Sequence, residues 1–109
     1  MKVMITGSRG IITEMDKYIP EGTTLIISGG APGIDRCAEL YADKNNIPKL
    51  VVRPDYKTYG KLAPLKRNKE MVDMADIVIA VWDGKSRGTK HAIDYAISVD
   101  KELKIYNVK

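Results

Sequence analysis

Ile77-Val78-Ile79-Ala80-Val81-Trp82 is the stretch that decides the fold, because it is apolar throughout and lacks the alternation of a strand with one face in water. A strand that helices cover on both faces has this pattern. The Gly-bearing segment 83–89 follows at once, as a turn from a strand into a helix would. We therefore predict that residues 77–82 form a central strand of a parallel sheet.

Strands and helices are expected to alternate along the rest of the chain. Short apolar runs bounded by Gly, Pro or Asn predict four more strands, at residues 3–6, 24–28, 50–52 and 104–108. The helices expected between them are a short amphipathic stretch up to Ile19, a helix from Ile34 to Asn45-Asn46, one over 63–74 and one after Thr89. Residues 54–64 are expected to form a loop.

This order predicts an α/β, Rossmann-like fold: a doubly wound, three-layer α/β/α arrangement around a five-stranded, mainly parallel sheet. Parallel crossovers are right-handed, so each helix lands on one face of the sheet or the other. A chain of 109 residues suits one such domain, and we assign residues 1–109 to it.

Two of the predicted helices carry an apolar face that should point into the core. The inward positions, spaced by three or four residues, are Ile34, Cys37, Ala38, Tyr41 and Ala42 in one helix and Ala92, Ile93, Ala96 and Ile97 in the other. Because Cys37 belongs to such a face, we expect a buried, inert thiol.

Composition excludes several classes of protein. No apolar run reaches the 18 residues of a spanning helix, and the apolar run at the N-terminus is too short for a secretory signal, so a cytoplasmic location without membrane contact is expected. One cysteine and one histidine, Cys37 and His91, argue against a disulfide framework and a metal site. The net charge of +4 is too small to indicate a nucleic-acid partner, although residues 56–69 hold five basic residues and no acid.

Glycine-rich turns follow three of the predicted strands, at residues 7–10, 29–33 and 84–89. The carboxyl ends of parallel strands meet at one edge of the sheet, where ligands bind at the point of strand-order reversal. Each turn is expected to lead toward a helix, whose first N–H groups can hold an anionic oxygen. There is no P-loop motif and no Gly-x-Gly-x-x-Gly after the first strand, so neither a P-loop NTPase nor an ordinary dinucleotide oxidoreductase is indicated.

Four separated motifs closely resemble the SLOG superfamily, and most of all its small YspA- and YpsA-related single-domain members. They are Gly7-Ser8-Arg9, Ser28-Gly29-Gly30-Ala31-Pro32-Gly33-Ile34-Asp35, Arg67-Asn68 ahead of Ala75-Asp76, and Asp83-Gly84-Lys85-Ser86-Arg87-Gly88-Thr89-Lys90-His91. The resemblance spans nearly the whole chain and implies a Rossmann-like sheet that binds nucleotides or ADP-ribose-like molecules.

The turns and the resemblance together give the residues expected to bind a small nucleotide-type ligand. They are Gly7, Ser8, Arg9, Ser28, Gly29, Gly30, Ala31, Gly33, Asp35, Arg67, Asn68, Asp83, Ser86, Arg87, Gly88, Thr89 and His91. Asp35 is a candidate for a helix cap or a ribose contact, and the positive end of a helix should lower the pKa of His91. Tyr56 and Tyr59 are equally consistent with covering a base and with packing over the sheet edge.

Three functions stay open, with no required cofactor, no metal and no catalytic residue assigned. The first is a sensor or sequestering module for a phosphorylated ligand such as ADP-ribose. Such a module is compatible with a homo-oligomer. The second is an N-glycosidase similar to the Lonely Guy phosphoribohydrolases, but Ala92 occupies the position of their expected Glu, so Asp35 or Asp83 would have to replace it. The third and least favoured is a single-stranded DNA binder similar to DprA, where Glu39 replaces the family's His.

Overall fold

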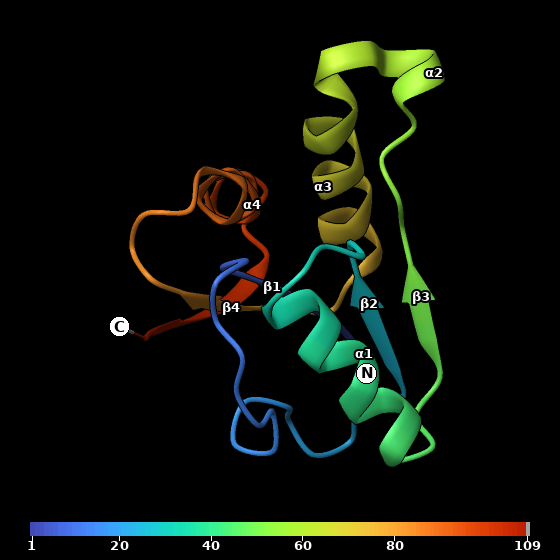
Figure 1. The fold of residues 1–109 in the computed structure, drawn as a ribbon, viewed down its shortest axis with the longest axis vertical. Helices are drawn as coiled ribbons and strands as arrows, with labels where there is room; N and C mark the ends of the chain where they lie inside the picture. Colours follow the sequence, from blue (N-terminus) through green and yellow to red (C-terminus); the bar gives the residue numbers. More distant parts are fainter. Residues whose placement is uncertain (109) are drawn as a thin grey trace.

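The computed structural model describes residues 1–108, which form one sheet with helices on both faces (Figure 1). The five strands are all parallel and lie in the order β3-β2-β1-β4-β5. Their bounds are Lys2–Gly7 for β1, Leu25–Ser28 for β2, Lys49–Val51 for β3, Ile77–Trp82 for β4 and Glu102–Asn107 for β5. The predicted Rossmann-like α/β fold is confirmed, and β4 has the predicted bounds.

Helix α1, Ile34–Lys44, covers one face of the sheet, whereas α3, Ala63–Met74, and α4, Arg87–Ser98, cover the other (Figure 1). Alternate residues of the central strands point to opposite faces. Ile5 accordingly packs in the core beneath α1, and Met4 packs in the core beneath α3 and α4. Both side chains are fully buried, as expected of a central strand covered on both sides.

The order of the strands reverses between β1 and β4, which places their carboxyl ends side by side. Gly7 pairs with Val81 at the end of this ladder, so the turns after the two strands start next to each other. On the other side of β1, the carboxyl end of β2 lies beside that of β3, where Ser28 pairs with Val51. This edge is therefore the place where a doubly wound sheet binds its ligand.

The prediction of a helix ending at Ile19 is wrong. Residues 8–24 cross from β1 to β2 as coil and turns. The segment has little room for a helix, because it is bounded by Gly10 and Pro20 and begins with β-branched residues. Met15 and Tyr18 instead reach into the core beneath α1, so this segment covers its part of the sheet without a helix.

Three further predictions need correction. Residues 54–64 are not a plain loop, since they contain the one-turn helix α2, Tyr56–Tyr59, and a 3-10 turn at Gly60–Leu62. Ile97 is 62% exposed because it lies about 140° around the axis of α4 from the buried Ala92. Cys37 is half-buried rather than buried, since it lies at the edge of the inward face of α1.

Candidate ligand-binding cleft

Two adjoining hollows open at the carboxyl ends of the strands. We call the first the inner compartment; it has a volume of about 130 Å³ and is lined by Thr6, Gly7, Arg9, Ala31, Asp35, Arg67, Asn68, Met71, Ser86, Gly88 and Thr89. The second, the outer compartment, has a volume of about 340 Å³ and is lined by Arg9, Gly29, Gly30, Ala31, Pro32, Arg53, Pro54, Tyr56, Pro64 and Arg67. They share Arg9, Ala31 and Arg67 and so form one cleft.

The turn after β1 is packed tightly against the start of α1. A Cβ atom on Gly7 would lie 2.4 Å from the backbone oxygen of Val81, and one on Gly33 would lie 2.4 Å from that of Ser8. Gly33 also has a φ of +79°, which favours glycine. Ser8 is buried and its Oγ accepts a hydrogen bond from Asp83 N at 2.9 Å. Neither Ser8 nor Gly33 lines the cleft. Their contacts connect the turn after β1 to the start of α1 and to the turn after β4.

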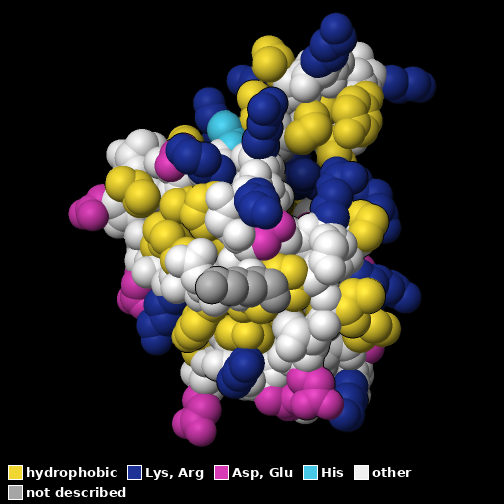
Figure 2. All heavy atoms as spheres, turned by 60° about the vertical axis from the view of Figure 1, so that its left-hand side comes forward, with side chains coloured by type: hydrophobic (Ala, Val, Ile, Leu, Met, Phe, Trp, Pro, Cys, Tyr) yellow, Lys and Arg dark blue, Asp and Glu magenta, His cyan; other side chains and the backbone are white. Residues whose placement is uncertain are grey.

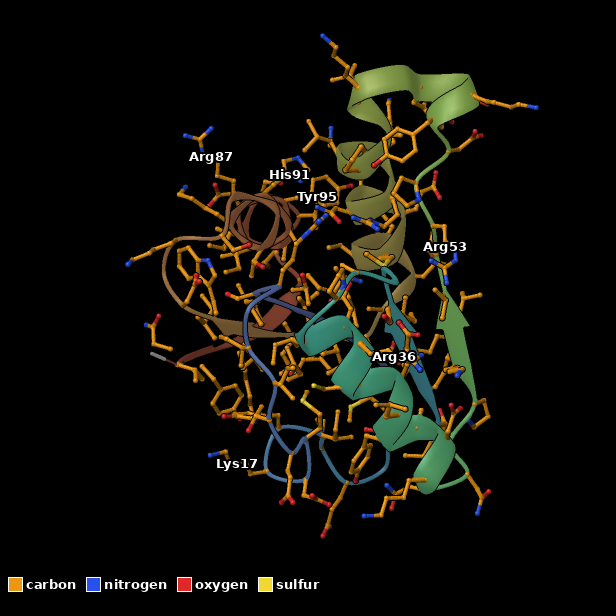
Figure 3. The ribbon with its side chains drawn as sticks, viewed as in Figure 1. Lys17, Arg36, Arg53, Arg87, His91 and Tyr95 are labelled. Atoms are coloured by element: carbon orange, nitrogen blue, oxygen red, sulfur yellow. The ribbon has the colours of Figure 1, made fainter. Side chains whose placement is uncertain are left out.

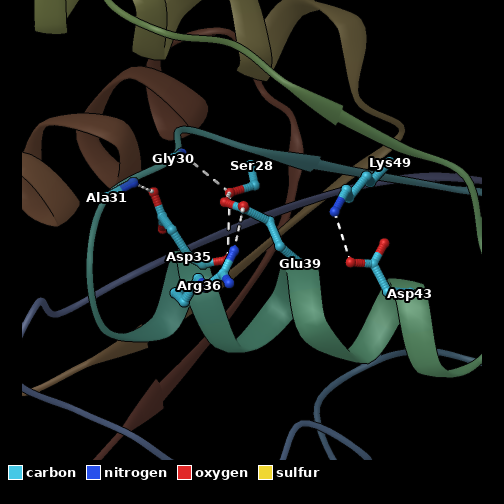
Figure 4. Close-up of polar contacts among 8 residues, drawn as sticks. All are labelled: Ser28, Gly30, Ala31, Asp35, Arg36, Glu39, Asp43 and Lys49. Carbon is cyan, nitrogen blue, oxygen red and sulfur yellow. Dashed lines mark hydrogen bonds and ion pairs between the residues drawn. The ribbon is translucent and has the colours of Figure 1, made fainter.

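The turn after β2 is held from within by buried side chains (Figure 4). Ser28 Oγ donates to Glu39 Oε2 at 2.8 Å and accepts from Gly30 N at 3.2 Å. Ala31 N donates to Asp35 Oδ2 at 3.3 Å. The N–H groups of Gly30 and Ala31 are thus already hydrogen-bonded within the turn. The turn therefore forms part of the cleft wall, but these two N–H groups do not donate into the cleft.

Asp35 is a buried carboxyl group on the wall of the inner compartment. Burial raises its pKa from 3.8 to about 6, while the hydrogen bond from Ala31 and the charge of Arg67 oppose the rise. Asp35 is the one acidic residue in the lining of either compartment, within residues 1–108.

Arg67 and Asn68 of α3 connect the turn after β2 to the start of α4. Arg67 Nη1 donates to Gly29 O at 2.7 Å, and its Nε donates to Asn68 Oδ1 at 3.1 Å. Asn68 is only 5% exposed, and its Nδ2 donates to Gly88 O at 3.3 Å. Partial burial of Arg67 lowers the pKa of its guanidinium, and Asp35 opposes this. Both side chains line the inner compartment.

The start of α4 forms the opposite wall of the inner compartment, through Ser86, Gly88 and Thr89. Ser86 N donates to Asp83 Oδ1 at 3.0 Å, so the exposed Asp83 shapes the turn from outside the cleft. The hydrogen bond from Lys85 N, followed by this one from Ser86 N, lowers the pKa of Asp83. The N–H groups of the first helical turn have no partner within the helix and can therefore receive an anion.

His91 and Arg87 also belong to α4 but line neither compartment (Figure 3). The pKa of His91 is lowered as expected, but the first cause is burial, followed by the charge of Lys69, rather than the end of the helix. Its Nδ1 lies 3.3 Å from Asn68 Nδ2, so a neutral imidazole can orient that amide.

The cleft thus brings together eleven of the residues expected to bind ligand: Gly7, Arg9, Gly29, Gly30, Ala31, Asp35, Arg67, Asn68, Ser86, Gly88 and Thr89. The other six lie outside its lining: Ser8, Ser28, Gly33, Asp83, Arg87 and His91. Sequence reasoning missed Arg53, which follows β3 at the same edge of the sheet. Its position after a parallel strand was a signal that could have found it.

On the face that Figure 2 shows, basic side chains gather over the end that carries α2 and the start of α3, and the acidic ones lie over the middle and lower parts among further basic ones. Within residues 1–108, no group of three or more His, Cys, Asp or Glu side chains is placed to hold a metal ion. No helix in this part of the chain combines the length and apolar character needed to cross a membrane.

A parallel sheet with a polar cleft at its strand-order reversal defines a Rossmann-like fold. The sequence model of the YspA, cpYpsA-related SLOG family matches residues 1–59, more than half of the chain, and the protein belongs to this family. Membership indicates, at a coarse level, the binding or processing of nucleotide-related ligands. The match includes the turns after β1 and β2 and reaches Arg53 and Tyr56. No curated protein and no solved structure matches the chain significantly.

Proposed function

We propose that the cleft binds a phosphorylated nucleotide-type ligand, such as a nucleotide or ADP-ribose, and that the protein acts as a sensor or sequestering module for it. The observation that carries this proposal is the inner compartment, where the start of α4 faces Arg67 of α3. Helix N–H groups and a guanidinium on two walls of one hollow form a site for an anionic oxygen.

The two compartments differ in a way that suits the two ends of a nucleotide. The inner one is small and polar, with Ser86 and Thr89 hydroxyls beside the helix start, and suits a phosphate group. The outer one is larger, and its lining adds Pro54, Pro64 and the ring of Tyr56. Apolar and aromatic surfaces of this kind accommodate a ribose or a base.

Two measurements test this proposal. The first is mass spectrometry of the small molecules released when the purified protein is denatured. The second is a thermal-shift screen over nucleoside monophosphates and diphosphates, ADP-ribose and NAD. A ligand present at 100 times its dissociation constant should add about 2.7 kcal/mol to the free energy of unfolding, which is easily detected. The absence of any released nucleotide together with no thermal shift across the screen would refute the proposal.

An N-glycosidase activity is a second candidate, because Asp35 places a buried carboxyl with a pKa of about 6 on the wall of the inner compartment. Such a group can act as a general acid or base near neutral pH. In this reaction water replaces the base at C1′ of the ribose, and the base leaves with a proton. Asp83 does not fit the role of this acid or base, because it lies outside the cleft lining and its carboxylate accepts hydrogen bonds from Lys85 N and Ser86 N.

Incubation with nucleoside monophosphates and with NAD, followed by chromatography, tests for release of free base. If the protein is an enzyme, Asp35→Asn should abolish release without unfolding the chain. Recovery of every ligand unchanged after long incubation would refute the N-glycosidase activity and leave ligand binding as the proposed function.

A further inference from the structure

We infer that Arg53 forms a second anion-binding subsite beside Gly30, and that the ligand therefore carries two phosphate groups. This inference rests on the proposed function, since it assumes that a phosphorylated ligand occupies the cleft. It adds the class of ligand: one with a diphosphate, in preference to a monophosphate.

Arg53 and Arg67 approach consecutive residues of the same turn. A Cβ atom built on Gly30 would lie 2.9 Å from Arg53 Nη1, and one built on Gly29 would lie 2.8 Å from Arg67 Nη1. With no Cβ atom at either glycine, the two guanidinium groups come close to the backbone of this turn. Arg53 belongs to the segment that follows β3 (Figure 3), and Arg67 belongs to α3, so two different elements bring the two cations to one turn.

The cations of the outer compartment have little negative charge to balance them. Within residues 1–108, Arg9, Arg53 and Arg67 form no ion pair with a carboxylate, and Asp35 is the single acid in the cleft lining. The Arg67 side chain donates hydrogen bonds to Gly29 O and Asn68 Oδ1. In contrast, the side chains of Arg9 and Arg53 donate no hydrogen bond to the described part of the protein, so their forked donors are free for phosphate oxygens.

The placement of the free donors distinguishes one phosphate from two. The inner compartment, at about 130 Å³, suits one phosphate group between α3 and α4, and Arg53 does not line it. Arg53 lines only the outer compartment, which joins the inner one through Arg9, Ala31 and Arg67. A second phosphate linked to the first would emerge past Arg67 toward Arg53. A monophosphate would leave Arg53 without an anion.

The experiment compares the affinities of AMP and ADP by isothermal titration at one fixed ionic strength, since salt screens such contacts. The variants are Arg53→Gln and the control Lys17→Gln, which removes a charge outside the cleft lining and far from Arg53 (Figure 3). Wild type and the control should bind ADP at least tenfold more tightly than AMP. Arg53→Gln should abolish this preference, because it should weaken ADP binding at least tenfold and AMP binding much less. Wild type should likewise prefer pyrophosphate to inorganic phosphate, and Arg53→Gln should lose this preference.

Each other outcome overturns the inference in a recognisable way. Equal affinity of the wild type for AMP and ADP would refute the second subsite while leaving the proposed function intact. Equal weakening of AMP and ADP in Arg53→Gln would show that Arg53 contacts the base or ribose. Binding of neither nucleotide, nor of phosphate or pyrophosphate, would remove both the inference and the nucleotide assignment on which it rests. Circular dichroism melting of each variant confirms that the compared proteins are folded.

Discussion

Replacing Gly88 with Asp should abolish ligand binding without harming the fold. Gly88 lies in the first turn of α4 and lines the inner compartment. A Cβ atom at this position would meet no heavy atom within 4 Å, and its φ is not positive, so the protein accommodates a larger residue there. An acidic residue near a helix start also stabilises the helix by about 0.3–1 kcal/mol. The melting temperature should therefore stay equal or rise slightly.

The same carboxylate would repel a phosphate bound at the start of α4. Two like charges about 4 Å apart repel by about 4 kcal/mol at an effective dielectric constant of 20. Since Gly88 is exposed and salt screens part of this repulsion, we expect a loss of affinity of at least about two orders of magnitude. Gly88→Asn is the matched control, because it adds nearly the same volume without the charge.

The assay is titration of ADP into wild type, Gly88→Asp and Gly88→Asn, with thermal melting of the same samples. Gly88→Asp should lose most of its affinity for ADP, and Gly88→Asn should lose much less. A Gly88→Asp protein that melts normally and binds ADP as wild type does would refute the placement of the phosphate at α4.

Three other predictions concern the turn after β2 and the groups that hold it. Gly30→Ala should lower stability by about 1 kcal/mol or more, measured by urea unfolding, since residue 30 has a φ of +76° and the new Cβ would crowd Arg53; unchanged stability would contradict this geometry. The pKa of Asp35 is raised from 3.8 to about 6 in the folded protein. The free energy of unfolding that this carboxyl contributes is therefore fully present below pH 3.8 and is lost as the pH rises through about 6, a change of about 3 kcal/mol. Unfolding of wild type and Asp35→Asn at several pH values should show that the variant lacks this loss, and parallel pH profiles would argue against the raised pKa. Ser28→Ala should cost about 1–3 kcal/mol, because it removes the 2.8 Å hydrogen bond to the buried Glu39; Thr24→Ala, on an exposed residue, provides the comparison in the same unfolding assay.

The strands could be predicted from sequence wherever burial on both faces imposes an uninterrupted apolar run. The stretch 77–82 is β4 with the predicted bounds, and residues 63–74 are α3 with the predicted bounds. The helix expected before Ile19 failed for a physical reason. Met15 and Tyr18 carry the spacing of an apolar face, but tertiary packing under α1 satisfies them in a coil, so the pattern alone did not decide the backbone.

The site was predictable at the level of turns but not at the level of contacts. The three glycine-rich turns converge as the parallel strand order requires, and the cleft contains both Arg67 and Gly88. No sequence pattern reveals that Ser28 and Asp35 would occupy the N–H groups of Gly30 and Ala31 from inside. Of the turns expected to offer N–H groups to a phosphate, the one after β2 therefore has two of its donors occupied, whereas the start of α4 keeps its first-turn donors.

The most direct test of the central claim is a titration of ADP into isotopically labelled protein, followed by amide resonances in nuclear magnetic resonance spectra. Binding in the cleft predicts that the largest shifts occur at Gly88 and Thr89 in α4 and at Gly29 and Gly30 after β2. The apolar hollow formed by Ile12, Leu40 and Tyr41 beside α1 should stay unaffected. Shifts confined to that hollow, or no shifts at millimolar ADP, would contradict the claim that this cleft is a nucleotide site.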